Sequence, residues 1–234
     1  DGLNWVNVGS PGFSQGTAYK TDLAIDNNGI LYIAFGDGSN GNKATVMKYD
    51  GLNWVNVGSP GFSQGTANLI RLAIDNSGIP YVAYRDYADS NVVTVKKYDG
   101  LNWVTVGSNA GTLPTPSYPC ANTNQINHLS ISIDNNGHPW ILYQYTSDDV
   151  GAGWSPICIQ VTAVMKYDGS IWSNWVVSPL IDEYYAGSIA FDNNGTPYIT
   201  YSTEAFCNGM HDKILFIEKY DSNTNSWIQV GNYI

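Results

Sequence analysis

The side chains in this sequence that are best suited to chemistry are acidic residues grouped in pairs. Asp148-Asp149 and Asp182-Glu183 both stand in segments that lack a regular hydrophobic pattern. Glycoside hydrolysis uses two carboxylates about 5–10 Å apart, and Ca²⁺ prefers oxygen ligands of this kind. Sequence spacing does not bring the two pairs together, and no EF-hand spacing accompanies them. The two pairs are therefore candidate Ca²⁺ ligands, and the alternative is that all four side chains are simply solvated.

Other catalytic arrangements are missing from the sequence. His128, His138 and His211 have no nearby nucleophile, and no G-x-S-x-G elbow is present. Arg71 and Arg85 are the only arginines, too few for the arginine cluster of a sialidase. The glycine-rich stretches precede no helical pattern, so they do not read as phosphate-binding loops, and no C-x-x-C pair indicates zinc. These observations predict that the protein is not an enzyme.

A repeat of about 49 residues organises the chain that must position these side chains. The segment DGLNWVNVGSPGFSQGTA occurs at 1–18 and again, unchanged, at 50–67, and its start returns at 99, 168 and 221. Each repeat then carries a pattern like L-A-I-D-N-N-G-x-P-Y, a run ending in Lys-Tyr-Asp, and a Trp segment. Each part is short, rich in Val, Ile, Tyr and Trp, and bounded by turn residues, as strands are. Four strands per repeat predict a β-propeller blade; the coils of a β-solenoid are usually shorter, about 20–30 residues.

Four blades and one surplus strand follow from this repeat. The expected blades cover residues 19–58, 68–107, 127–178 and 185–231 of a single domain, and residues 1–10 are a Trp strand without partners. We favour a four-bladed ring, and a fragment of a propeller with five or more blades is the alternative. An unpaired edge strand is a template for pairing, so Trp5, Val6 and Val8 are candidates for self-association with a neighbouring molecule.

Most repeated polar and aromatic residues are predicted to be structural. The Asp of each Asp-Asn-Asn-Gly or Tyr-Asp-Gly turn is expected to cap its own turn. Each Trp at the repeated strand position is expected in the core, because burying an indole removes about 150–250 Å² from water. This second group comprises Trp5, Trp54, Trp103, Trp172 and Trp227.

The insertions predict a variable binding face. In a propeller blade the first-to-second and third-to-fourth strand turns share one face, and all large insertions here fall in the other connections. Loops on a rigid scaffold often carry function, and aromatic side chains among polar ones suit a sugar ring or a protein partner. The alternative is that these tyrosines merely pack the insertions. The candidate residues are Tyr87, Tyr118, Tyr145, Trp154, Tyr184 and Tyr185, with Asp148 and Asp149.

Composition narrows the setting in which the protein works. A formal net charge of −10 argues against a nucleic-acid partner, and no apolar run is long enough to insert into a membrane. Few charged residues and many Asn, Gly, Ser, Thr and Tyr favour an extracellular location. Of the three cysteines, Cys120 and Cys158 are the preferred disulfide pair because both belong to the third blade, which leaves Cys207 over.

The repeat also resembles a known group of proteins. W-V-x-V-G-x-x-G-F-S-x-G, L-A-I-D-x-x-G-x-P-Y-V-A-Y and K-A-T-V-M-K-Y-x-G are similar to propeller repeats in large secreted proteins of Bacteroidetes-like bacteria that use a type nine secretion system. The resemblance covers nearly the whole chain and is clearest in the first two repeats. It implies a secreted or cell-surface, non-catalytic structural or interaction module. The alternative function is a lectin-like, carbohydrate-binding propeller.

Overall fold

The structure, a computed structural model, describes residues 3–89, 92–108, 110, 126–149, 157–175, 184–207 and 210–231. In this part of the chain the strands form four separate sheets, and each sheet has four antiparallel strands in sequence order. The predicted all-β propeller with four blades of four strands is therefore confirmed. Among these residues there is no helix with the length and apolar character of a membrane span.

The strands follow the predicted order within each blade. The first blade contains β1 (Ala18–Ile25), β2 (Leu31–Asp37), β3 (Lys43–Tyr49) and β4 (Trp54–Asn56). The second contains β5 (Ala67–Ile74), β6 (Pro80–Asp86), β7 (Val93–Tyr98) and β8 (Trp103–Thr105). The third contains β9 (Ile126–Ile133), β10 (Pro139–Asp149), β11 (Ile157–Tyr167) and β12 (Trp172–Asn174). The fourth contains β13 (Tyr184–Phe191), β14 (Pro197–Cys207), β15 (Met210–Asp221) and β16 (Ser226–Gln229).

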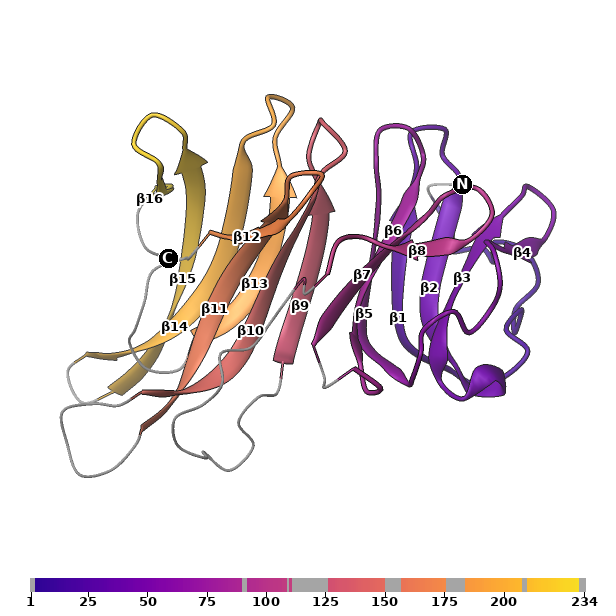
Figure 1. The fold of residues 1–234 in the computed structure, drawn as a ribbon, viewed down its shortest axis with the longest axis horizontal. Coiled ribbons are helices and arrows are strands. Elements are labelled where there is room, and N and C mark those ends of the chain that lie inside the picture. The colour runs from indigo at the N-terminus through magenta and orange to yellow at the C-terminus, as the bar shows by residue number, and fades with distance from the viewer. Residues whose placement is uncertain are drawn as a thin grey trace.

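The first strand of each blade is the innermost one. β1, β5, β9 and β13 lie next to one another in this order, and the sheets extend outward from them (Figure 1). The turns carry the predicted caps: the Asp26 carboxylate accepts from the backbone N–H groups of Asn28 and Ile30 at 2.9 and 2.8 Å. Asp75, Asp134 and Asp192 make the equivalent pair of bonds. Local side-chain bonds thus fix the turns that align each blade.

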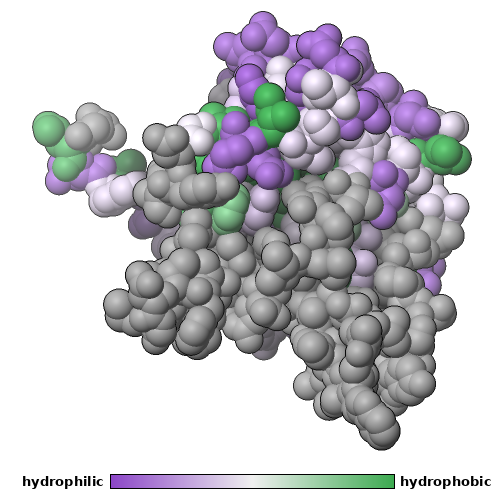
Figure 2. All heavy atoms as spheres, turned by 90° about the vertical axis from the view of Figure 1, so that its left-hand side faces the viewer, coloured by the Kyte–Doolittle hydropathy of each residue, from purple (hydrophilic) through white to green (hydrophobic). Residues whose placement is uncertain are grey.

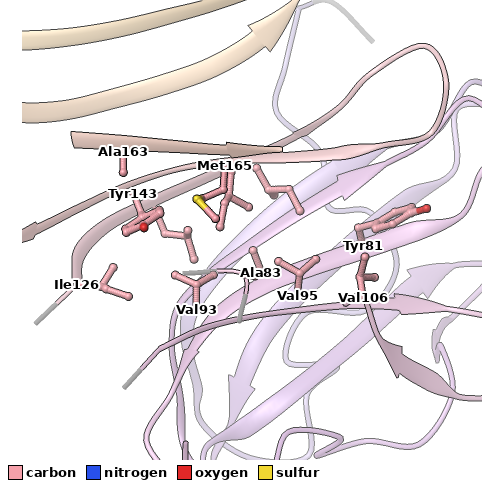
Figure 3. Close-up of a cluster of buried hydrophobic side chains, with 13 residues drawn as sticks. Tyr81, Ala83, Val93, Val95, Val106, Ile126, Tyr143, Ala163 and Met165 are labelled. Atoms are coloured by element: carbon pink, nitrogen blue, oxygen red, sulfur yellow. The ribbon is translucent and has the colours of Figure 1, made fainter. Parts of the chain in front are cut away.

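Side chains interdigitating between adjacent blades form the core. Between the second and third blades, Val93 and Val95 face Ile126, Tyr143 and residues around them, all of them buried (Figure 3). Equivalent clusters lie between the first and second blades and between the third and fourth. Because each cluster takes residues from two sheets, the apolar face of a blade is buried only where another blade packs against it.

The inner strand of the first blade has an uncovered face. Leu72 is 6% exposed, and the equivalent Ile131 and Ile189 are 9% and 3% exposed, because residues of the preceding blade cover them. Leu23 holds the same position in β1 and is 57% exposed. Among the described residues, therefore, the first blade lacks on this side the neighbour that each later blade has.

The predicted surplus strand does not form a strand. Residues 3–10 have no ladder partner in the described structure, and the side chains of Trp5, Val6 and Val8 are exposed. The Val8 carbonyl accepts a bond from the Trp54 indole N–H at 2.9 Å. Val57 and Val106, at the end of the first and second blades, accept in the same way from the next blade's Trp. Residues 3–10 thus occupy the place that the outer strand of the preceding blade takes beside each of the next two blades.

The second and third strands of the third and fourth blades are longer than those of the first two blades. β10 and β11 stay paired as far as Asp149 and Ile157, and β14 and β15 as far as Cys207 and Met210. Residues 144–149 and 157–161 are thus paired strands of an extended hairpin. In the second of these segments Ile157, Ile159 and Val161 alternate along the sequence, a pattern that suits a strand.

Candidate functional site

The predicted residue Tyr87 is a fixed, exposed aromatic side chain. The residue is 46% exposed, and its hydroxyl accepts hydrogen bonds from Arg85 Nη2 and Asn68 Nδ2, each at 3.0 Å. The Arg85 guanidinium also lies 4.7 Å from the centre of the ring. The cation–π contact and the two bonds hold the ring in one orientation. Tyr87 lines none of the three pockets described below.

The other predicted residues lie on strands or outside the described residues. Tyr145 stacks on Tyr143 with ring centres 5.8 Å apart and packs on the core, and burial raises its pKa. Asp148 and Asp149 lie on β10 opposite Cys158 and Ile157, and Tyr184 and Tyr185 lie on β13. Tyr118, Trp154 and Cys120 lie outside the described residues, so the Cys120–Cys158 disulfide stays a prediction. No cluster of three or more metal-ligating side chains occurs within the described ranges. The Ca²⁺ site also stays a prediction.

A larger pocket, here called the fourth-blade pocket, lies where sequence reasoning placed none. It has a volume of about 660 Å³ and opens beside β15 and β16. On the same side of the molecule, hydrophobic side chains stand among hydrophilic ones (Figure 2), and the exposed apolar residues of these strands are Leu215 and Ile228. The pocket is lined by Asn174, Trp175, Glu218, Tyr220, Asn225, Ser226 and Trp227.

Strand alternation places these side chains together. Glu218 and Tyr220 are two residues apart on β15, so they point to the same face of the sheet. Trp227 pairs with Tyr220 across the β15–β16 ladder, and Trp175 follows the end of β12 in the preceding blade. The Trp175 ring is 4.5 Å from the Tyr220 ring and 4.9 Å from the Trp140 ring. The Tyr220 ring also lies 5.6 Å from the Trp227 ring, so these contacts hold three aromatic side chains beside one cavity.

Two polar atoms of the pocket have no hydrogen-bond partner. Glu218 Oε1 accepts from the Tyr201 hydroxyl at 2.9 Å, but Oε2 is unpaired among the described residues. The indole N–H of Trp227 is unpaired there as well, whereas the equivalent Trp54, Trp103 and Trp172 all donate to a backbone carbonyl. Burial raises the pKa of Glu218, an effect that the Tyr201 bond opposes. A buried donor or acceptor without a partner costs about 1–3 kcal/mol, so both atoms are unfavourably placed in this arrangement.

Comparison of the repeats shows what the pocket lacks. Phe13 stacks on Trp54 with ring centres 4.5 Å apart at 16°, and Phe62 stacks on Trp103 at 4.4 Å and 14°. Both phenylalanines come from the G-F-S-Q-G motif that precedes the blade. The connection before the fourth blade, residues 176–183, reads VVSPLIDE and contains no aromatic residue. The protein therefore supplies no ring of its own from this connection to stack on Trp227.

Sequence reasoning missed this site because it grouped Trp227 with the core tryptophans. Two signals in the sequence point to it. The G-F-S-Q-G motif is absent before the fourth blade, and Glu218 stands where the earlier repeats have Met47, Lys96 and Met165.

The fold and this pocket define a β-propeller with a polar, aromatic-lined cavity. Neither a protein-family model nor a curated protein sequence matches the chain. Solved structures do match. An ulvan lyase of polysaccharide lyase family PL25 has a TM-score of 0.55 at 15% identity, covering 90% of this chain and 57% of that one. An α-L-arabinanase from Penicillium chrysogenum has a TM-score of 0.58 at 14% identity, covering 93% and 66%.

Lectins are among the similar structures too. The Aleuria aurantia lectin, in complex with Fucα1-6GlcNAc, has a TM-score of 0.53 at 19% identity. The match covers 93% of this chain and 64% of the lectin. This chain thus spans about three fifths of the length of these proteins, and at such low identity the likeness shows the shared propeller fold.

The expectation of a non-catalytic structural module is contradicted by these comparisons. Similar structures include a polysaccharide lyase, an arabinanase and an endo-1,4-β-xylanase. The prediction that the protein is not an enzyme was wrong in its reasoning, because it relied on the absence of contiguous motifs. A propeller brings together functional residues from separate blades, so a site of this kind leaves no short sequence motif.

Proposed function

We propose that the protein recognises carbohydrate and that the fourth-blade pocket is a saccharide-binding site. The observation that carries the proposal is the pocket beside Trp227, because the connection before the fourth blade has no counterpart in sequence of Phe13 and Phe62, which stack on the equivalent tryptophans. A sugar ring has a flat apolar face that can occupy the place of such a phenyl ring, since aromatic rings suit partners with one apolar and one polar side.

The polar atoms of the pocket support the same ligand class. Glu218 Oε2 can accept from a sugar hydroxyl, and the indole N–H of Trp227 can donate to a sugar oxygen. Asn174 and Asn225 add further donors and acceptors at the rim. The similar structures named above, three enzymes and a lectin, support a carbohydrate-related role without deciding between binding alone and bond cleavage.

The test is binding of carbohydrates to the full chain and to a Trp175→Ala variant. Suitable probes are ulvan, arabinan, xylan and Fucα1-6GlcNAc, with affinity measured by calorimetry and new chain ends measured in the same samples. We expect binding of at least one probe and a loss of about tenfold or more in Trp175→Ala, because one stacking platform is removed. Trp5→Ala is the matched control, since Trp5 is fully exposed and outside the pocket. Absence of binding to all probes, or equal loss in both variants, would refute the proposal.

We also propose an extracellular site of action. Support comes from the low charged fraction, 13%, and from the resemblance of the repeat to secreted propeller repeats. Fractionation of the source cells, with detection of the chain in the medium or on the surface, tests it; recovery only from the cell interior would refute it.

A further inference from the structure

A smaller cavity in the second blade has a counterpart in the first. The second-blade pocket has a volume of about 200 Å³ and the first-blade pocket about 350 Å³. Both lie between the second, third and fourth strands of their blade and the connection that precedes the blade. Seven lining positions are equivalent, each pair 49 residues apart: Gln15/Gln64, Phe35/Tyr84, Asp37/Asp86, Asn40/Asp89, Thr45/Thr94, Met47/Lys96 and Asn56/Thr105.

The two pockets differ in chemistry although their frameworks are nearly the same. Phe35 is replaced by Tyr84 and Met47 by Lys96, so the second-blade pocket gains a hydroxyl and an ammonium group. The connections that precede the two blades are identical in sequence over 18 residues. The first blade folds with Phe35 and Met47 at these positions. The blade fold therefore does not require the Tyr84 hydroxyl or the Lys96 ammonium group in the second blade.

The Tyr84 hydroxyl has no partner within the described residues. The side chain is 0% exposed, and the oxygen makes no hydrogen bond there. Burial, followed by the nearby Asp86 and Asp89 carboxylates, raises the pKa of Tyr84, so the group stays a protonated donor. An unpaired buried hydroxyl is unfavourable, and Phe35 shows that the blade folds without it.

Lys96 is also without an ion pair among the described residues. The neighbouring Asp86 carboxylate instead accepts backbone N–H groups of Gln64, Gly65 and Ala88, at 3.2, 3.0 and 3.0 Å. Burial lowers the pKa of Lys96, and Asp86 opposes this effect. Tyr84 and Lys96 therefore line one cavity, and among the described residues the Tyr84 hydroxyl has no hydrogen-bond partner and the Lys96 ammonium has no ion pair.

We infer that the second-blade pocket is a second saccharide site, in which Tyr84 and Lys96 donate to the oxygens of a single sugar unit. The ligand class rests on the proposed function of the fourth-blade pocket; the site itself rests on the two donors. Its volume is less than a third of the larger pocket, which limits it to one unit. Gln64, Asp89, Thr94 and Thr105 supply further groups for hydroxyls. With two separate sites, the protein would bind a branched or repeating glycan divalently, which raises its apparent affinity.

The chain itself provides the variants for a test. Tyr84→Phe and Lys96→Met recreate the residues of the first blade, so both are expected to fold, and circular dichroism checks this. The probes are the free monosaccharides L-fucose, L-arabinose, D-xylose and L-rhamnose, titrated into isotopically labelled full chain. Backbone amides of Thr94 to Lys96 report the second-blade pocket, and the Trp227 indole N–H reports the fourth-blade pocket.

We expect saturable shifts at residues 94–96 with at least one probe. Each single variant is expected to weaken that binding about tenfold, as for a lost bond to a polar or charged donor. Trp175→Ala should leave these shifts intact, so failure of the fourth-blade site is distinguishable from failure of this one. No shift at residues 94–96 with any probe means a pocket that holds only water and overturns the inference. Shifts that persist unchanged in both Tyr84→Phe and Lys96→Met overturn it as well.

Discussion

Truncating one leucine in each of the first two blades measures whether the first blade has a neighbour in solution. Leu23 and Leu72 hold the same strand position, but they are 57% and 6% exposed. Leu→Ala removes about three carbon groups at about 0.8 kcal/mol each, or roughly 2.4 kcal/mol of transfer free energy when the side chain is fully buried. In a packed core the cavity left behind adds to this, and measured costs run from about 2.7 to 5 kcal/mol.

The two variants should therefore differ clearly. Leu72→Ala is expected to lower the free energy of unfolding by about 3 kcal/mol. Leu23→Ala is expected to lower it by about 1 kcal/mol, since less than half of the side chain is buried and no closed cavity forms. Urea denaturation of both variants and the unchanged chain, followed by tryptophan fluorescence, gives the two differences.

Equal losses would refute the reasoning. They would mean that the face of β1 carrying Leu23 is covered in solution. Repeating the measurement at several protein concentrations then identifies what covers this face. Stabilisation by a second copy depends on protein concentration, whereas ring closure within one chain does not.

Three further outcomes follow from single contacts. Ser63→Ala should lower the free energy of unfolding by about 1–3 kcal/mol in urea titrations, because the Ser63 hydroxyl accepts a hydrogen bond from the buried Ala44 N–H of the first blade. The equivalent Ser14 hydroxyl donates to the Gly16 carbonyl, so Ser14→Ala should lower the free energy of unfolding by less. Phe62→Ala should cost about 2–4 kcal/mol by the loss of its partly buried ring and its stack on Trp103, and an unchanged thermal midpoint would contradict this. The pKa of Glu218 is raised in the folded state, so the stability it gives when protonated is lost as pH rises through that pKa. Glu218→Gln should therefore raise the thermal midpoint at pH 7 and not below pH about 4; the same gain at both pH values would contradict the assigned cause.

Much of the fold was predictable because its determinants are local. The turn aspartates bond to backbone groups two to four residues away, so the same short sequence makes the same turn in every blade. Strand positions follow from alternation over a few residues. The extended hairpin of β10 and β11 was missed because pairing between residues 144–149 and 157–161 depends on the partner strand rather than on either segment alone.

The candidate site was less predictable because it joins two blades. Trp175 comes from the end of the third blade, and Glu218 and Trp227 come from the fourth. No short segment of the sequence therefore contains all three residues. Tyr87, predicted as a binding residue, is exposed, and its fixed orientation depends on Arg85 and on Asn68 from the neighbouring strand.

The two copies of the 18-residue segment separate what sequence determined from what tertiary structure decided. Trp5 and Trp54 lie in identical sequences, and both are followed by the same turn residues and the same phenylalanine. Sequence thus determined the repeat, the strands, the turns and the propeller class. Yet Trp54 pairs across to β3 and meets Phe13 and Val8, while Trp5 is fully exposed. Burial of a side chain is set by the neighbouring blade, and only the assembled structure shows which blade has one.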